Sequence, residues 1–261
     1  MQHSTLETAR RHLIGVDPAA LLHSRNRLAE TGMARLGFLL PHQVKRALAA
    51  EALELVEHHR HWGELLPGGT EPVDDPPRHR IEVPPQAIAT HANLIPQLYD
   101  CDVLRRNLSV VAAESVLPCP EPRRYAVTRV HHDELPQWHW DDYSFALVLV
   151  VECPPLEEGG FVQTVAHTHR DRQFPDVHRT LTRNPIHSWE LHPGDLYLMR
   201  TASTLHRVYP FEHGRRTIMS MCFATRADLD RPDAARAAGQ SENTPVGRFV
   251  PVLRVMTDHR Q

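Results

Sequence analysis

The hydrophobic pattern of the chain changes its period at a proline-rich stretch between positions 118 and 122. Before this stretch, apolar residues recur at the spacing of amphipathic helices. After it, short apolar segments alternate with turn signals, as in strands that pair in antiparallel sheets. This change predicts an α+β protein in which an N-terminal helical layer (1–118) supports a β core (123–225). We expect one domain over 1–261, with 226–261 as a C-terminal tail.

In the N-terminal half, helical periodicity extends from Thr5 to Gly63, with helix-start signals at Pro18 and Pro41. Gly63 is the predicted end of the second long helix. Residues 67–85 are rich in Pro, Gly and Asp, which predicts a loop. That loop is either a lid over a site or a plain surface connection. Helical character returns over 86–114.

The C-terminal half is a series of short strand-like segments. Residues 144–152 form a nearly continuous apolar run, as expected for a strand covered on both faces. The spacing of the segments predicts a jelly roll, with strands at 125–130, 144–152, 161–165, 188–191, 196–200, 205–209 and 217–223. The tail is expected to be partly helical over 227–243. Residues 249–256 form a candidate last strand, which Pro251 would confine to a sheet edge.

Composition narrows the class of protein. The formal net charge is −3 and 23% of residues are charged, so no basic surface for nucleic acid is expected. The polar N-terminus lacks the apolar core of a signal peptide, and the longest apolar run is too short to cross a bilayer. The four cysteines have no CxxC spacing and are expected to be free thiols in a reducing cytoplasm. The oligomeric state stays open, a homodimer being one option.

The segment Trp138–Asp142 contains the residues with the clearest chemistry. His139 and Asp141 are two positions apart, so in an extended strand both side chains point the same way and can bind one ion. His206, from a distant strand, would complete a set of three ligands. Two histidines and one carboxylate, with open positions, suit non-heme Fe(II) oxygenases.

The histidine pattern alone is ambiguous, because the chain has 20 histidines. A second His-x-Asp, His131 and Asp133, lies just upstream. The alternative to a metal site is a hydrogen-bonded His–Asp pair beside an unrelated core histidine.

The order of the motifs favours His139 and Asp141. They are followed by Glu158-Gly159-Gly160, by Pro193-Gly194-Asp195, by His206-Arg207-Val208-Tyr209-Pro210 and by Gly214-Arg215-Arg216. In this order the segment from Arg123 to Thr225 resembles the Fe(II)/2-oxoglutarate-dependent dioxygenases. The resemblance implies a double-stranded β-helix, which is a jelly roll, with Fe(II) as the cofactor and 2-oxoglutarate and O₂ as co-substrates.

The resemblance also implies a residue that binds the co-substrate. The far carboxylate of 2-oxoglutarate needs a fixed cation, and arginine offers a bidentate geometry that lysine lacks. Arg215 and Arg216 point to opposite faces of a strand, so only one of them can face the iron. The spacing in the family selects Arg216.

Asp141 bears on the reaction. In related iron halogenases a Gly or Ala stands at this position and leaves room for chloride. The carboxylate of Asp141 predicts that no halide binds, so hydroxylation is expected, with desaturation or cyclopropane-forming ring closure as alternatives.

A narrower resemblance concerns the substrate. The residues Trp138 to Tyr143 and the strand Arg216 to Phe223 are similar to the halogenases and hydroxylases that act on free amino acids such as lysine. This resemblance implies a free amino acid or a lysine-like derivative as the substrate, in a biosynthetic pathway such as that of a peptide antibiotic. The substrate residues that it implies are Asp142, which would face an amine, and Trp140, Ser220 and Cys222. Ser220 and Cys222 stand where an amide and a hydroxyl are expected, so the amino acid stays undetermined.

The sequence gives weaker support to two other functions. A cupin-type metal-binding protein without 2-oxoglutarate turnover would use a pair such as His167-x-His169, but those residues lie in a polar segment. A modifier of proteins or nucleic acids would need a basic groove or a recognition domain, and the sequence suggests neither.

Overall fold

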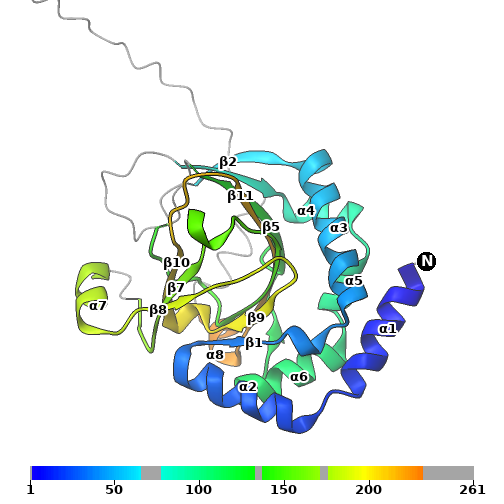
Figure 1. Cartoon of the computed structure of the whole chain (residues 1–261). Coiled ribbons are helices and arrows are strands. Elements are labelled where there is room, and N and C mark those ends of the chain that lie inside the picture. Colours follow the sequence, from blue (N-terminus) through cyan, green and yellow to red (C-terminus); the bar gives the residue numbers. More distant parts are fainter. Residues whose placement is uncertain (1, 66–77, 133–136, 171–175, 232–261) are drawn as a thin grey trace, which may run out of the picture.

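Two antiparallel sheets face each other at the centre of the computed structural model, which describes residues 2–65, 78–132, 137–170 and 176–231 (Figure 1). The strands of the larger sheet run in the order β1-β9-β6-β11-β5-β3-β2, and β4 pairs with the end of β11. These strands are β1 (Met33–Arg35), β2 (His61–Leu65), β3 (Arg78–Val83), β4 (Leu117–Pro118), β5 (Tyr125–His131), β6 (Phe145–Glu152), β9 (Leu196–Met199) and β11 (Arg215–Ala224). The smaller sheet has the order β10-β7-β8, with β7 (Val162–Ala166), β8 (His187–Trp189) and β10 (Thr204–Val208).

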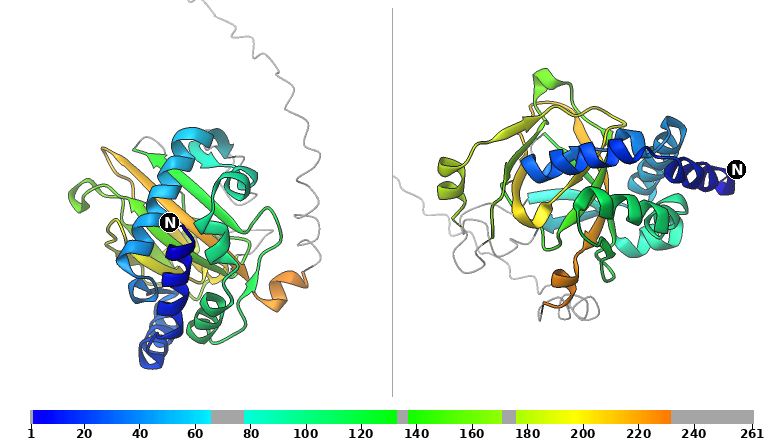
Figure 2. Two further views of the ribbon diagram at one scale, coloured as in Figure 1. Left: turned by 90° about the vertical axis from the view of Figure 1, so that its right-hand side faces the viewer. Right: turned by 90° about the horizontal axis from the view of Figure 1, so that it is seen from below.

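The N-terminal helices cover the outer face of the larger sheet, as Figures 1 and 2 show. They are α1 (Gln2–Ile14), α2 (Pro18–Thr31), α3 (His42–His59), α4 (Pro85–His91), α5 (Leu94–Tyr99) and α6 (Asp102–Ala112). Two short helices lie elsewhere in the chain, α7 (Val177–Arg183) beside the smaller sheet and α8 (Arg226–Leu229) after β11. Among the residues described, none of these helices combines the length and the apolar character that crossing a bilayer would require.

The alternation of side chains on the central strands β6 and β11 separates two cores. Phe145, Leu147 and Leu149 of β6 pack outward against the helices. Ala146 and Val148 point inward, into the space between the two sheets. A strand with apolar residues on both faces must be covered on both, which explains the continuous apolar run of β6. The predicted α+β jelly roll with an N-terminal helical layer is confirmed.

Local signals set the first helices. Asp17 caps α2, because its carboxylate accepts a hydrogen bond from the Ala19 amide, and Pro18 occupies the first turn. Gly32 ends α2 with φ +72°. A Cβ at Gly32 would lie 2.3 Å from the Thr204 hydroxyl, so only glycine lets the chain pass directly from α2 into β1.

Three predictions in the N-terminal half are wrong. Gly63 does not end a helix, since α3 ends at His59 and Gly63 lies within β2. The helical stretch is also interrupted by β1, which pairs with β9. The predicted 67–85 loop contains β3 at 78–83, which pairs with β5. β1 and β3 pair with strands that lie far away in the sequence, and β2 pairs with β3, so local periodicity could not reveal these strands.

The remaining predictions concern segments that lie wholly or partly outside the described residues. The lid hypothesis concerns 67–77, which lies outside them. In the tail, α8 accounts for the start of the predicted helical stretch. The candidate strand 249–256 lies outside the described residues.

Candidate metal centre

The segment that carries His139 and Asp141 is extended, but it is not the strand that we predicted. It follows β5 and precedes β6, and His139 forms a single isolated bridge with His206 of β10. In this bridge each residue donates its amide to the other's carbonyl, both at 3.0 Å. The Asp141 amide donates to the Thr201 carbonyl at 3.2 Å. Backbone bonds therefore hold both ligand-bearing positions against the chain around β10.

The side chains of His139, Asp141 and His206 converge. The Nε2 atom of His139 lies 3.7 Å from Oδ1 of Asp141, and Nε2 of His206 lies 4.0 Å from Oδ2. One ligand atom from each residue lies within 4.8 Å of the others, a separation that one ion can bridge. The donor set suits a non-heme iron site.

Both imidazole rings are oriented by their second nitrogen. Nδ1 of His139 lies 2.7 Å from the Gln137 carbonyl, and Nδ1 of His206 lies 2.9 Å from the Thr204 carbonyl. A carbonyl can only accept a hydrogen bond, so each Nδ1 carries the proton and donates it, which leaves the Nε2 lone pair free for a metal. Burial and the neighbouring His139 lower the pKa of His206 to about 4, against the opposing charge of Asp141. His206 is therefore neutral at neutral pH, as a metal ligand must be.

Arg216 provides a buried positive charge between the sheets. Its side chain is 2% exposed, and its Nη1 donates to the Gly160 carbonyl at 3.0 Å and contacts Cys153 Sγ at 3.1 Å. Its Nε is buried without a hydrogen-bond partner. Among the described residues no carboxylate pairs with this guanidinium. Since buried charges are normally paired, Arg216 is a candidate to bind an anion.

Arg129 shows what a satisfied buried arginine looks like in the same sheet. Its guanidinium pairs with Glu57 at 2.8 Å and with Glu152 at 2.9 Å, and its Nε donates to Thr217 at 2.9 Å. Arg215 lies on the same outer face of the sheet and pairs with Glu152 at 2.8 Å. Of the adjacent arginines, Arg216 is therefore the one that points inward.

Tyr197 of β9 belongs to the site and was missed by the sequence reasoning. It is 4% exposed, and burial raises the pKa of its hydroxyl, although the adjacent Arg216 opposes this shift. The charge of Asp141 also reaches this hydroxyl. Alternation along β9 could have revealed it, because Leu196 and Leu198 pack in the outer core and Tyr197 between them must point inward.

The predicted substrate residues are not all together. Ser220 and Cys222 share the inner face of β11 with Arg216 and are half-buried. Burial and the charge of Asp141 raise the pKa of Cys222 to about 12. Asp142 instead pairs with Arg170 at 3.2 Å, and its side chain is 51% exposed.

Trp140 points away from the three ligand residues. It packs with Val165 and Leu205 on the outer side of the smaller sheet, and its indole N–H donates to the Thr168 hydroxyl at 2.9 Å. This position corrects the predicted substrate role, because Trp140 holds the segment in place by packing. Alternation sends it to the face opposite His139 and Asp141.

The other titratable clusters lie elsewhere. His167 has φ +59°, and its ring nitrogen lies 3.1 Å from the Glu30 carbonyl, so it does not join a cupin-like ligand pair here. Asp133 of the competing His-x-Asp lies outside the described residues. Glu158, Glu212 and His213 also lie close together, but His213 and Glu212 are exposed, and His213 pairs with Glu158.

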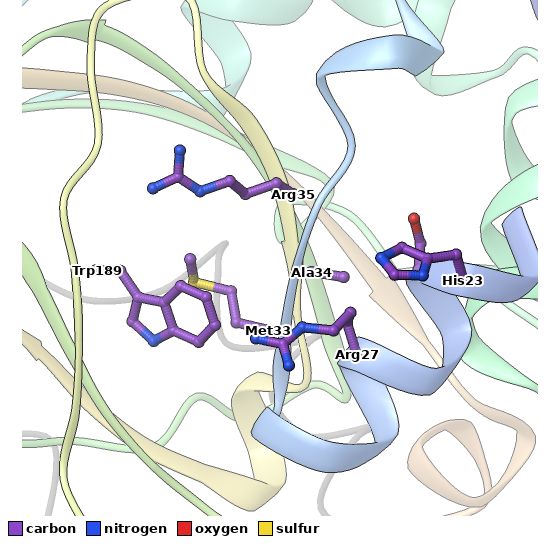
Figure 3. A pocket seen from close by; sticks show the side chains of 7 residues that line it. His23, Arg27, Met33, Ala34, Arg35 and Trp189 are labelled. Carbon is purple, nitrogen blue, oxygen red and sulfur yellow. The ribbon is translucent and has the colours of Figure 1, made fainter. Parts of the chain in front are cut away.

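A separate pocket opens between α2, β1 and β8, where Figure 3 shows Trp189 and two arginines around Met33. Both arginines already have acidic partners, since Arg27 pairs with Glu30 and Arg35 with Asp195. The pocket contains none of the converging ligand residues. It is lined by His23, Ser24, Arg27, Met33, Ala34, Arg35 and Trp189.

Comparisons with known proteins agree with this geometry. A sequence model of the family described as Halogenase D matches residues 16–241. No curated protein matches the chain.

Solved structures share the fold. AviO1 from Streptomyces viridochromogenes Tue57 superposes with a TM-score of 0.59 at 18% identity, covering 81% of this chain and 96% of AviO1. The epimerase SnoN, solved with Fe3+, alpha ketoglutarate and nogalamycin RO, gives 0.59 at 16% identity, covering 92% and 98%. The alpha ketoglutarate dependent carbocyclase SnoK gives 0.55 at 13% identity, covering 81% and 85%. At such low identity the likeness establishes the fold.

Proposed function

The chain belongs to the halogenase D family and has the fold of the Fe(II)/2-oxoglutarate oxygenases, and from this premise we propose that it oxidises a C–H bond of a small molecule with Fe(II), 2-oxoglutarate and O₂. The observation that carries the proposal is the buried guanidinium of Arg216, which has no carboxylate partner among the described residues, within the barrel that also contains the converging His139, Asp141 and His206. A metal site needs the three ligands alone. A buried cation in addition implies an anionic co-substrate.

Each residue has a distinct proposed role. His139, Asp141 and His206 hold Fe(II) on one side and leave its other positions open. Bound Fe(II) would supply O₂ activation coupled to the conversion of 2-oxoglutarate into succinate and CO₂. Arg216 binds the far carboxylate of 2-oxoglutarate through charge-assisted hydrogen bonds, and the Tyr197 hydroxyl contributes to the same carboxylate site.

Hydroxylation is the favoured outcome despite the name of the family. Asp141 presents a carboxylate to the metal position, with Oδ1 3.7 Å from His139 Nε2 and Oδ2 4.0 Å from His206 Nε2. A bound carboxylate leaves no vacant ligand position for a halide. Desaturation or oxidative cyclisation by the same iron chemistry is the alternative, and a carbocyclase among the structures of this fold is compatible with it.

We further propose a free amino acid or a lysine-like derivative as the substrate. The support is the resemblance of Trp138 to Tyr143 and of the β11 strand to enzymes that act on free amino acids.

The first test concerns the co-substrate. Anaerobic addition of Fe(II) and 2-oxoglutarate is expected to give a weak visible charge-transfer band from the chelate. Absence of the band would favour a cupin-type metal-binding protein instead.

The second test concerns the product. Succinate release is measured over a panel of free amino acids with chloride present, and the products are weighed by mass spectrometry. Gain of one oxygen is expected, loss of two hydrogens would indicate desaturation or cyclisation, and gain of chlorine would contradict the role given to Asp141.

A further inference from the structure

The segment that carries His139 and Asp141 lacks the regular hydrogen-bond ladder of a strand. Among the described residues, its backbone is attached by the isolated bridge between His139 and His206 and by the bond from the Asp141 amide to Thr201. In a sheet, a ladder of such bonds fixes the position of every residue along the strand. Here side-chain contacts must supply what the missing ladder does not.

The neighbours of His139 lie on the opposite face from its imidazole, because side chains alternate along an extended segment. On either side of an antiparallel bridge the next residues also lie opposite one another, so Trp140 faces Leu205 and Trp138 faces Arg207. Trp140 packs on Leu205. The guanidinium carbon of Arg207 lies 4.8 Å from the centre of the Trp138 ring. A cation–π pair therefore lies directly outside the bridge that joins the two histidine ligands.

Arg207 is also held by the residues of β10 and β7 around it. Its Nε donates to the side-chain oxygen of Gln163 at 2.9 Å, and its guanidinium carbon lies 5.5 Å from the centre of the Tyr209 ring. Tyr209 in turn stacks on Phe161, with 4.4 Å between the ring centres. Among the described residues no carboxylate pairs with Arg207, so the aromatic faces of Trp138 and Tyr209 stabilise its charge. The guanidinium is thus a fixed surface on which Trp138 can rest.

We propose that the pair of Arg207 and Trp138 positions His139 for metal binding. This inference rests on the proposed function, because it concerns the same metal centre, and it adds a positioning residue that lies on the outer face of the smaller sheet. The imidazole of His139 reaches the metal position only while its backbone stays against β10, and the outer pair holds it there. A planar guanidinium stacks on an indole better than an ammonium or an apolar chain does.

The experiment measures metal binding by the full chain under anaerobic conditions. Co(II), whose binding is followed by its visible absorption, is titrated alone, and Fe(II) is titrated with 2-oxoglutarate. Arg207→Met is expected to raise the Kd of both metals about tenfold, as found when a group that orients a metal ligand is removed. Arg207→Lys keeps a cation and should recover part of the affinity. Thermal unfolding without metal shows whether each variant is folded.

A double variant tests whether the two side chains act as one unit. Trp138→Leu is expected to raise the Kd for Co(II) by about the same factor as Arg207→Met, and the double variant should raise it no further, because either change alone breaks the pair. The matched control is Phe161→Leu on the same face of the sheet, since the Phe161 ring stacks on Tyr209 and not on Trp138. This variant should leave the Kd for Co(II) unchanged.

The outcomes separate the inference from the proposed function. The inference is overturned if Arg207→Met binds Co(II) as tightly as the native protein, or if Phe161→Leu weakens Co(II) binding equally. It is also overturned if the effects of Arg207→Met and Trp138→Leu multiply in full in the double variant. Should Arg207→Met fail to fold, Arg207→Lys takes its place, with a smaller rise in Kd expected. A native protein that binds Co(II) but gives no charge-transfer band with Fe(II) and 2-oxoglutarate would overturn the proposed function alone.

Discussion

Two buried arginines on the paired strands β5 and β11 differ in the groups that surround them, and this difference suggests a structural role for one and a binding role for the other. Arg129 and Arg216 are both buried, with exposed fractions of 3% and 2%. Arg129 lies on β5 and Arg216 on its neighbour β11. Arg129 has two carboxylates and a hydroxyl around it, so its charge is satisfied by the fold. Arg216 contacts a carbonyl, a thiol and the Tyr197 hydroxyl and has an unpaired Nε, so no acidic side chain among the described residues neutralises its charge.

Substitution by leucine is expected to separate these roles. Arg216→Leu should raise the Kd for 2-oxoglutarate about a hundredfold, the loss expected for a bidentate contact with a charged group. It should not lower the melting temperature of the protein without co-substrate, because an unpaired buried charge is removed. Arg129→Leu should lower the melting temperature and leave the Kd for 2-oxoglutarate unchanged. Titration of the charge-transfer band and thermal unfolding measure the two effects, and equal loss of 2-oxoglutarate binding in both variants would contradict the assignment.

At the scale of elements, the short helix α5 connects the helical layer to the site. The carboxylate of Glu51, on α3, accepts hydrogen bonds from the amides of Asn93, Leu94 and Ile95 at 3.0, 2.9 and 2.8 Å. The amides at the start of a helix cannot form hydrogen bonds within it, so the Glu51 carboxylate supplies an acceptor, and its negative charge complements the helix dipole. At the other end of α5, the Tyr99 hydroxyl donates to the Cys222 carbonyl at 2.9 Å and accepts from the Cys119 amide at 2.8 Å.

Loss of this cap is expected to cost stability. Glu51→Ala should lower the free energy of unfolding by about 1–3 kcal/mol, because three amides at the start of α5 lose their acceptor. The matched control is Glu54→Ala on the exposed side of the same helix, which should stay within about 0.5 kcal/mol of the native protein. Chemical denaturation measures both. If the two variants lose the same amount, the cap does not stabilise α5.

At the scale of the whole molecule, one polar cluster joins the helical layer to the barrel. Arg129 of β5 connects Glu57 of α3, Glu152 of β6 and Thr217 of β11. The hydrogen bond and the charge of Arg129 lower the pKa of Glu57. Partial burial alone would raise the pKa of Glu152, but hydrogen bonds from Thr217 and Arg215 and the charge of Arg129 outweigh burial and lower it.

These shifts determine the expected response to acid. A carboxylate whose pKa in the folded state lies below its ordinary value of 4.5 stabilises the fold above pH 4.5, and this contribution is lost as the pH falls through the folded pKa. The free energy of unfolding should therefore decrease as the pH is lowered below 4.5. In Arg129→Leu the slope should be shallower, because the pKa values return toward 4.5. Urea unfolding at a series of pH values tests this, and parallel curves for both proteins would refute it.

Much of the architecture could be read from local patterns. The helical period before position 118 and the strand segments after it predicted the helical layer and the positions of the C-terminal strands along the chain, because one face of each element must be apolar. Period-two alternation paired His139 with Asp141, because it depends only on the sequence. The order and spacing of motifs shared with the Fe(II)/2-oxoglutarate-dependent dioxygenases selected His206 and Arg216.

What the sequence alone determined is therefore the type of most long elements and which residues of a strand share a face. The tertiary structure decided which strands pair and which charges are neutralised. Strands β1 and β3 escaped prediction because their partners β9 and β5 lie far along the chain. The pairing of β6 with both β9 and β11 places Tyr197 where its hydroxyl interacts with Arg216. Whether a buried arginine has a carboxylate partner depends on neighbours that come together only when the chain folds.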